Sequence, residues 1–256
     1  MSTSAHSRHL PPQVDSVRIH TTLICLPPAS THQLGLLPDR IAARAAGHTN
    51  GVPALVSPNH FTIAANLTGR ETALLINPHR SPAGTARCAG GPFGLLDFTE
   101  FAALTAAVGT GIHTEWEQAV RGTAPAAPWR AYLDLADIRD HGSVEAAVDD
   151  FFAQPRIAAV TAHMETGAVL PDIHEYGAAL EAHQDGPASY AAHLAATSLY
   201  GDALITEHGD LLAPGLTVRP PIDHTLAERA AYFTAASAYL RGADPNTVVI
   251  AAACPL

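Results

Sequence analysis

Two kinds of apolar segment alternate along the chain, and this alternation limits the fold more than any other feature. Short runs rich in β-branched residues, such as residues 17–26 and 247–254, are typical of strands. Longer stretches, such as residues 98–120, carry apolar residues at helical spacing. We therefore predict an α/β or α+β fold with a mixed sheet, formed by a single domain over residues 17–256. Residues 1–16 are polar and contain prolines, which predicts a mobile N-terminal arm.

The remaining elements follow from the same patterns and from turn residues. Two glycines, Gly109 and Gly111, are expected to interrupt the helix over residues 98–120. The stretch 78–94 is rich in glycine and proline, and it predicts a long loop of the kind that often carries function. Further helices are expected at residues 36–46, 143–152, 190–200 and 225–240. Residues 53–78 predict two strands paired around Gly69, with 73–76 as an apolar core strand, and further strands are expected at 129–135 and 157–161. A hairpin is expected at 203–213, with its turn at His208 and Gly209.

The chain contains no lysine, because all 14 of its Lys and Arg residues are arginine. This excludes a Schiff base, a pyridoxal-phosphate anchor and a P-loop lysine. The formal net charge of −10 repels nucleic-acid phosphates and anionic membranes, and it mildly favours a cationic substrate. We therefore expect a small-molecule substrate rather than a nucleic acid or a membrane as the partner.

Three cysteines, Cys25, Cys88 and Cys254, lie far apart in the sequence, which fits neither a disulfide framework nor a CxxC metal site. A reducing compartment is therefore expected. The N-terminal residues lack the apolar core of a signal peptide, and no apolar run approaches the roughly 18 residues that span a bilayer. These patterns predict a cytoplasmic protein, and nothing in them indicates an oligomeric state.

Candidate metal ligands are densest between residues 163 and 183. His163, His174 and His183 could converge if this segment folds back on itself, with Glu175 or Glu165 as a carboxylate ligand. Such ligands suit zinc, manganese or non-haem iron. The spacing matches no established metal motif, and surface histidines with one core imidazole would give the same pattern. No cofactor is therefore expected, with a divalent metal such as zinc as the alternative.

Cys254 is a candidate nucleophile because it follows an apolar strand near the end of the chain. A thiolate nucleophile needs a neighbour that lowers its pKa and a histidine that moves protons. Cys88, which follows Arg87 in the glycine-rich loop, is a second candidate, whereas Cys25 lies within a predicted strand and is expected in the core. The alternative for Cys254 is a small buried apolar residue.

The order of these elements resembles the guanidine-modifying superfamily of dimethylarginine dimethylaminohydrolases, arginine deiminases and amidinotransferases. The paired strands of residues 58–66 and 73–78, the His163-Met-Glu-Thr-Gly segment and the terminal Cys254 are similar to elements of that family. The resemblance covers residues 17–256 and implies a fan of five ββαβ units around a central site. It also implies that Cys254 attacks the guanidinium carbon and that His163 shuttles protons.

The chain departs from the family's pattern in its acidic residues. Asn66 stands where the family has a carboxylate, and an amide cannot neutralise a guanidinium. Glu115 or Glu165 could bind the substrate instead. Three functions therefore remain: a Cys/His hydrolase or transferase that acts on a carbon–nitrogen bond of a small cationic substrate, a metal-dependent enzyme, and a non-catalytic binding or assembly protein of the same fold.

Overall fold

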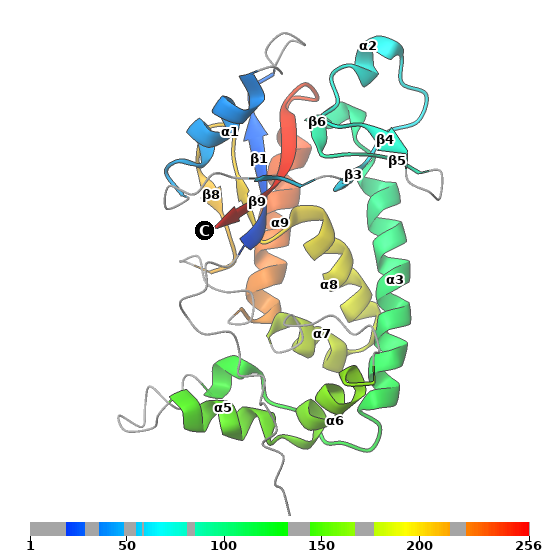
Figure 1. Cartoon of the computed structure of the whole chain (residues 1–256), viewed down its shortest axis with the longest axis vertical. Coiled ribbons are helices and arrows are strands. Elements are labelled where there is room, and N and C mark those ends of the chain that lie inside the picture. The colour runs from blue at the N-terminus through cyan, green and yellow to red at the C-terminus, as the bar shows by residue number, and fades with distance from the viewer. Residues whose placement is uncertain are drawn as a thin grey trace, which may run out of the picture.

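A six-stranded sheet occupies one end of the molecule and a group of helices occupies the other (Figure 1). The computed structural model describes residues 19–28, 36–48, 55–57, 59–80, 85–132, 144–166, 177–215 and 224–255. The expected arm at residues 1–16 lies outside these ranges. The sheet contains both parallel and antiparallel pairs, which confirms the predicted α/β or α+β class with a mixed sheet.

The two central strands of this sheet come from opposite ends of the chain. β1 (Ile19–Leu26) and β9 (Val248–Pro255) are antiparallel along their whole length, in a register that pairs Leu23 with Ala251. β7 (Ala203–Ile205) is parallel to β1 on its other side, and β8 (Leu211–Leu212) completes the predicted hairpin. The second edge of β9 is shared by β2 (Leu55–Val56) and β6 (Gly90–Pro92).

The region between β2 and β6 differs from its prediction. Its strands are β3 (Phe61–Thr62), β4 (His79–Arg80) and β5 (Ala86–Cys88), which form a second sheet in the order β3-β5-β4. Thr68 begins the short helix α2 (Gly69–Thr72) with a capping box to Glu71, so Gly69 lies in a helical turn and not between two strands. The expected core strand at 73–76 is a turn followed by a single β-bridge, between Ile76 and Gly90, and the expected loop at 78–94 contains β4, β5 and β6.

Helices follow one another through the middle of the chain. They are α3 (Phe98–Ala119), α5 (Val144–Phe152), α6 (Pro155–Met164), α7 (Ala178–Asp185) and α8 (Pro187–Tyr200), and α9 (Leu226–Gly242) follows the β7–β8 hairpin. Between β6 and β7 the described residues contain no strand, so they do not form the fan of five ββαβ units that the resemblance implied.

Two predicted strands in this region are helical. Residues 129–132 form a helical turn, and the remainder of the expected strand at 129–135 lies outside the described residues. The expected strand at 157–161 belongs to α6, because Pro155 begins a helix and the buried Ile157 and Val160 are three positions apart on one face.

α3 runs without a break along the helical region, and its two glycines differ. A Cβ atom at Gly109 would lie 3.0 Å from the Cα atom of Ala191 in α8, whereas one at Gly111 would meet nothing within 4 Å. Gly109 therefore allows α3 and α8 to pack closely. The predicted interruption of the helix at the two glycines is wrong.

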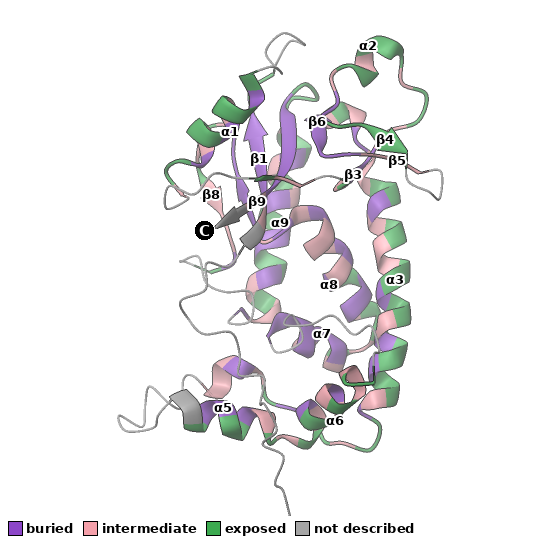
Figure 2. Ribbon diagram, in the orientation of Figure 1, coloured by how far each residue is buried: buried purple, intermediate pink, exposed green. Residues whose placement is uncertain are grey.

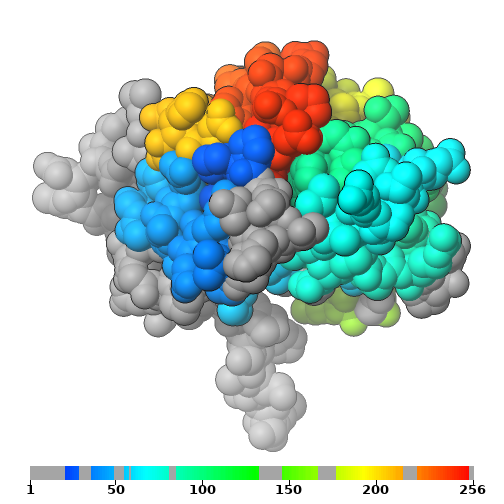
Figure 3. All heavy atoms as spheres, turned by 90° about the horizontal axis from the view of Figure 1, so that it is seen from above, coloured from blue at the N-terminus to red at the C-terminus, as the bar shows by residue number. Residues whose placement is uncertain are grey.

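The sheet is buried on both faces, and a separate core lies among the helices (Figure 2). On one face Leu23 packs with residues of α9, and on the other Ile24 packs with α1 (Leu37–Ala45). Viewed from the sheet end, α1 and the second sheet lie on opposite sides of β1 (Figure 3). A 3-10 turn, η2 (Phe93–Leu95), joins β6 to α3.

Candidate functional site

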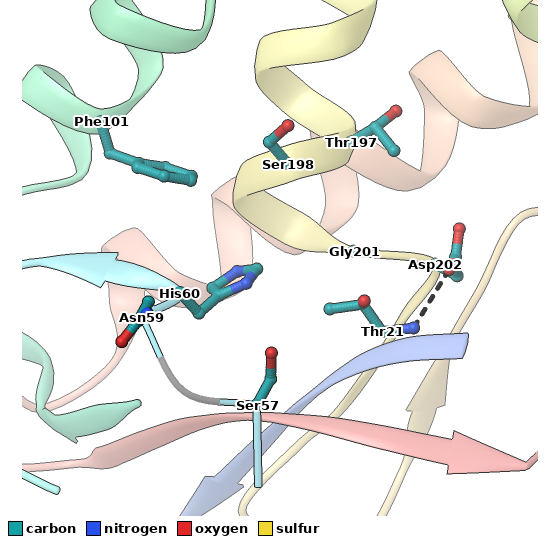
Figure 4. Close-up of a pocket in the computed structure, with 9 residues that line it drawn as sticks. All are labelled: Thr21, Ser57, Asn59, His60, Phe101, Thr197, Ser198, Gly201 and Asp202. Atoms are coloured by element: carbon teal, nitrogen blue, oxygen red, sulfur yellow. Dashed lines mark hydrogen bonds between the residues drawn. The ribbon is translucent and has the colours of Figure 1, made fainter. Parts of the chain in front are cut away.

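A pocket lies where the start of β1, the turn after β2, α3 and the end of α8 meet (Figure 4). Its volume is about 360 Å³, near the lower end of the ~300–1,000 Å³ that is typical of small-molecule sites. Hydroxyl, amide, imidazole and carboxylate groups from distant parts of the chain meet there. The lining residues are Thr21, Ser57, Asn59, His60, Phe101, Thr197, Ser198, Gly201 and Asp202.

His60 reaches the pocket from a tight turn that is fixed to the sheet. The backbone N–H of Ser57 donates to the carbonyl oxygen of Ala251 in β9 (2.8 Å). Asn59 then has a φ of +67°, a left-handed conformation that asparagine adopts more readily than most residues. Figure 4 shows the His60 ring between Ser57 and the end of α8. The ring also packs edge-on against Phe61, with 4.6 Å between the ring centroids.

Hydrogen bonding and burial define the state of the His60 ring. Its Nε2 lies 3.4 Å from the carbonyl oxygen of Leu199, and because a carbonyl can only accept, Nε2 carries the proton and Nδ1 keeps a lone pair. Burial lowers the pKa of His60 to about 4, with a further contribution from the charge of Arg87, although the bond to Leu199 acts in the opposite direction. The ring is therefore neutral at neutral pH and can accept a hydrogen bond or a proton.

Asp202 is the carboxylate of the pocket, and it is already paired. Its Oδ2 accepts from the backbone N–H of Thr21 (3.2 Å), as the dashed line in Figure 4 shows. Its Oδ1 accepts from Nη1 of Arg229 in α9 (3.1 Å). The carboxylate is therefore held by a peptide group on one side and by a buried guanidinium on the other.

Gly201 allows α8 and β1 to meet at this point. Its φ is +67°, and a Cβ atom here would collide with the carbonyl oxygen of Thr21. The same carbonyl accepts a hydrogen bond from the backbone N–H of Asp202 (2.7 Å). Glycine at position 201 is thus required both by the left-handed conformation that ends α8 and by the close approach of β1.

Charges of both signs surround the pocket. The end of α8 carries the partial negative charge of a helix C-terminus. Arg87 opposes it, since its guanidinium lies over the ring of Phe101, 5.1 Å from the centroid. Because Asp202 and Arg229 also offset each other, the pocket offers hydrogen-bond donors and acceptors without a strong net charge.

The structure does not bring Cys254 and His163 together. Cys254 lies in β9, whereas His163 lies in α6 at the far end of the helical region, with α7 and α8 between them (Figure 1). In the backbone register, the partner of Cys254 is His20 of β1. A cysteine nucleophile at position 254 stays a prediction, but His163 is not the histidine beside it.

The other two cysteines are buried thiols. Burial raises the pKa of Cys25 to about 12 and that of Cys88 to about 11. Cys88 therefore lacks the low pKa that a reactive thiol in a loop would need, and it lies in β5 rather than in a loop.

The residues predicted to bind a cationic substrate come from three separate elements and lie outside the pocket. Asn66 is exposed in a turn before α2, with a φ of +63°. Glu115 is exposed on α3, and Glu165 is exposed at the end of α6. None of the three lines the pocket.

The metal alternative also finds no support among the residues that can be placed. His174 and Glu175 lie outside the described residues, and His163 and His183 belong to α6 and α7. Within the described ranges, no group of three or more His, Cys, Asp or Glu residues could hold a metal ion.

His183 instead belongs to a buried cluster of rings. Its Nδ1 lies 3.1 Å from Nδ1 of His113, so one imidazole donates a hydrogen bond to the other. The His183 ring stacks on Tyr190 and on Trp116, with centroid separations of 3.5 Å and 4.7 Å. Burial, together with the neighbouring His113 and His193, lowers the pKa of His183 to about 3. These contacts show that His183 is a buried residue of the helical core.

The sequence analysis did not identify His60, Asp202 or Arg229 as site residues. Only short sequence features mark two of these residues: a Pro-Asn pair precedes His60, and a glycine at the end of a predicted helix precedes Asp202. Each is ordinary turn chemistry by itself. Only the fold shows that these turns meet.

Comparisons with known proteins add no family. No protein-family model matches the chain, and no curated protein or solved structure is significantly similar to it. Membership of the guanidine-modifying superfamily therefore stays a prediction. Among the described helices, none is long and apolar enough to cross a membrane.

Proposed function

We propose that this chain binds a small uncharged polar molecule, one that carries hydroxyl or amide groups, in the pocket formed by His60 and Asp202. The observation that carries this proposal is the set of uncharged donors and acceptors around one cavity whose carboxylate is already paired. Ser57, Thr197 and Ser198 contribute hydroxyl groups that can either donate or accept.

In this proposal His60 orients the bound molecule. Its Nε2–H is committed to Leu199, so Nδ1 accepts a hydrogen bond from an N–H or O–H group of the ligand. The lowered pKa keeps this acceptor unprotonated at neutral pH. The same atom could take a proton during a reaction, and it would serve that role in a hydrolase or a lyase.

The charges argue against the small cation that the sequence analysis favoured. A guanidinium or ammonium group needs an acceptor with negative charge, and the pocket's carboxylate is bound by Arg229. An uncharged amide or alcohol makes the same hydrogen bonds without that need.

Three probes of similar size and shape test the proposal: acetamide, acetamidinium and acetate, which are neutral, cationic and anionic. Binding is followed by NMR through the backbone N–H signals of Thr21 and Gly201. We expect saturable shifts with acetamide at millimolar concentration, and an affinity for the two ions lower by about tenfold or more.

A pair of matched variants localises the effect. His60→Phe keeps an aromatic ring but removes the acceptor, and it should lower the affinity for acetamide by about fivefold or more. His79→Phe alters an exposed histidine of β4 and should leave it unchanged. Equal affinity for all three probes, or no effect of His60→Phe, would contradict the proposal.

A further inference from the structure

Arg229 is an arginine that is buried behind the pocket. It lies in the first half of α9, and its side chain is 3% exposed. Its guanidinium extends to the end of α8, where it donates to Asp202 Oδ1 (3.1 Å) and to Thr197 Oγ1 (3.1 Å). It also stacks over Phe233, 4.9 Å from the ring centroid. A third, longer hydrogen bond goes to the carbonyl oxygen of Gly201 (3.4 Å). All three partners line the pocket, although Arg229 itself does not.

The position of Arg229 gives the pocket an internal counter-ion. The carboxylate of Asp202 accepts hydrogen bonds from the guanidinium of Arg229 and from the N–H of Thr21. A cationic ligand at Asp202 would share this carboxylate with a guanidinium that cannot lose its proton. A neutral ligand meets no such repulsion.

We infer that Arg229 sets the charge selectivity of the pocket, by occupying Asp202 so that neutral ligands bind and cations are excluded. This inference rests on the proposed function, because it concerns which ligands enter the same pocket. Arg229 acts through Asp202 and Thr197, so it is a positioning residue. We therefore expect the pocket to become a cation site when the balance of charge beside Asp202 changes.

The first test is Arg229→Gln, which removes the charge but keeps an amide donor. We expect its affinity for acetamidinium to rise by about tenfold or more, because the charge of Asp202 is no longer offset by a guanidinium, while its affinity for acetamide changes less than about threefold. Arg241→Gln removes a positive charge from an exposed position on the same helix, and it should bind all three probes as the wild type does. Arg229→Gln combined with Asp202→Asn should lose the gain for acetamidinium.

A second pair of variants tests the role of Arg229 if Arg229→Gln does not fold. Thr197→Asp adds a carboxylate beside Arg229 and leaves the Arg229–Asp202 pair in place. It should bind acetamidinium more tightly than its neutral counterpart Thr197→Asn does. The inference would be overturned if both Arg229→Gln and Thr197→Asp excluded acetamidinium. If Arg229→Gln does not fold, exclusion of acetamidinium by Thr197→Asp alone would overturn it. If the wild type also binds no acetamide, the proposed function fails; if the wild type binds acetamide, only the role of Arg229 fails.

Discussion

The sheet buries aliphatic side chains completely, such as those of Leu23, Ile24 and Leu204, whereas the helical region buries His113 and His183 among its aromatic rings. The aliphatic core gains its stability from the removal of apolar surface from water, which does not depend on pH. The buried imidazole of His183, whose pKa is lowered by burial, is favourable there only while it remains neutral. The two regions should therefore respond differently to the same change in conditions.

The largest effect is expected in the sheet. Leu23→Ala removes a fully buried side chain between β1 and α9 and should lower the free energy of unfolding by about 2–5 kcal/mol. Urea unfolding should give the same loss at about pH 7.5 and at about pH 5.5, since no titratable group is changed. Leu104→Ala alters a leucine of α3 that is 44% exposed, and it should cost less than about 0.5 kcal/mol.

A smaller effect, dependent on pH, is expected among the helices. The pKa of His183 is about 3 in the folded chain, so between that value and the ~6.5 of an unfolded histidine the unfolded state binds the extra proton. Stability therefore falls as the pH is lowered through this window, and His183 should account for about 1.4 kcal/mol of loss between about pH 7.5 and 5.5.

Substitution of this histidine gives the corresponding test. His183→Phe should reduce the loss of unfolding free energy on acidification by about 1.4 kcal/mol in urea titrations. His208→Asn, which changes an exposed histidine of the β7–β8 turn, is the matched control. An unchanged pH dependence in His183→Phe would show that this ring is not buried neutral.

The two glycines of α3 should separate packing from helix propensity. Gly111→Ala places its Cβ in open space and should raise the free energy of unfolding by up to about 1 kcal/mol. Gly109→Ala makes the same chemical change against Ala191 and should lower it by about 1 kcal/mol or more, as an overpacked contact does. Thermal melts of both variants measure the difference. Equal stabilisation by both would mean that α3 and α8 are less closely packed than described.

The smallest effect concerns the thiols of the two sheets. Because Cys25 and Cys88 are buried with raised pKa values, neither should react rapidly with a disulfide reagent in the native protein at about pH 8. Any rapid reaction of the wild type should therefore disappear in Cys254→Ser and persist in Cys88→Ser. A rapid reaction that survives Cys254→Ser would show that one of the two buried thiols is accessible.

The elements with a strong local pattern of apolar and turn residues were predicted correctly. The β-branched runs of β1 and β9, the β7–β8 hairpin and the helices α1, α8 and α9 lie where their patterns placed them. The errors arose where tertiary contacts or capping outweighed local propensity. Ile157 and Val160 suggested a strand, but they face a helical core, and Thr68 and Glu71 cap a helical turn around a glycine.

The pocket could not be derived in the same way. His60, Thr197 and Asp202 belong to separate segments, and none of them has a local motif. Their meeting depends on the close approach of the C-terminal end of α8 to β1, which Gly201 permits. A hydrogen bond between a helix end and a distant histidine leaves no periodic signal in the sequence.

The pairing of β1 with β9 has a consequence for how the chain folds during synthesis. β1 is made before the other strands of its sheet, but β9, its longest partner, is separated from it by roughly 220 residues, and closure of so long a loop costs conformational entropy. Until β7 and β9 leave the ribosome, the apolar residues of β1 have no sheet to join. The helices between them can form from local contacts much earlier. β9 would thus be the strand that closes the sheet, and a chain truncated before residue 248 would leave one edge of β1 unpaired.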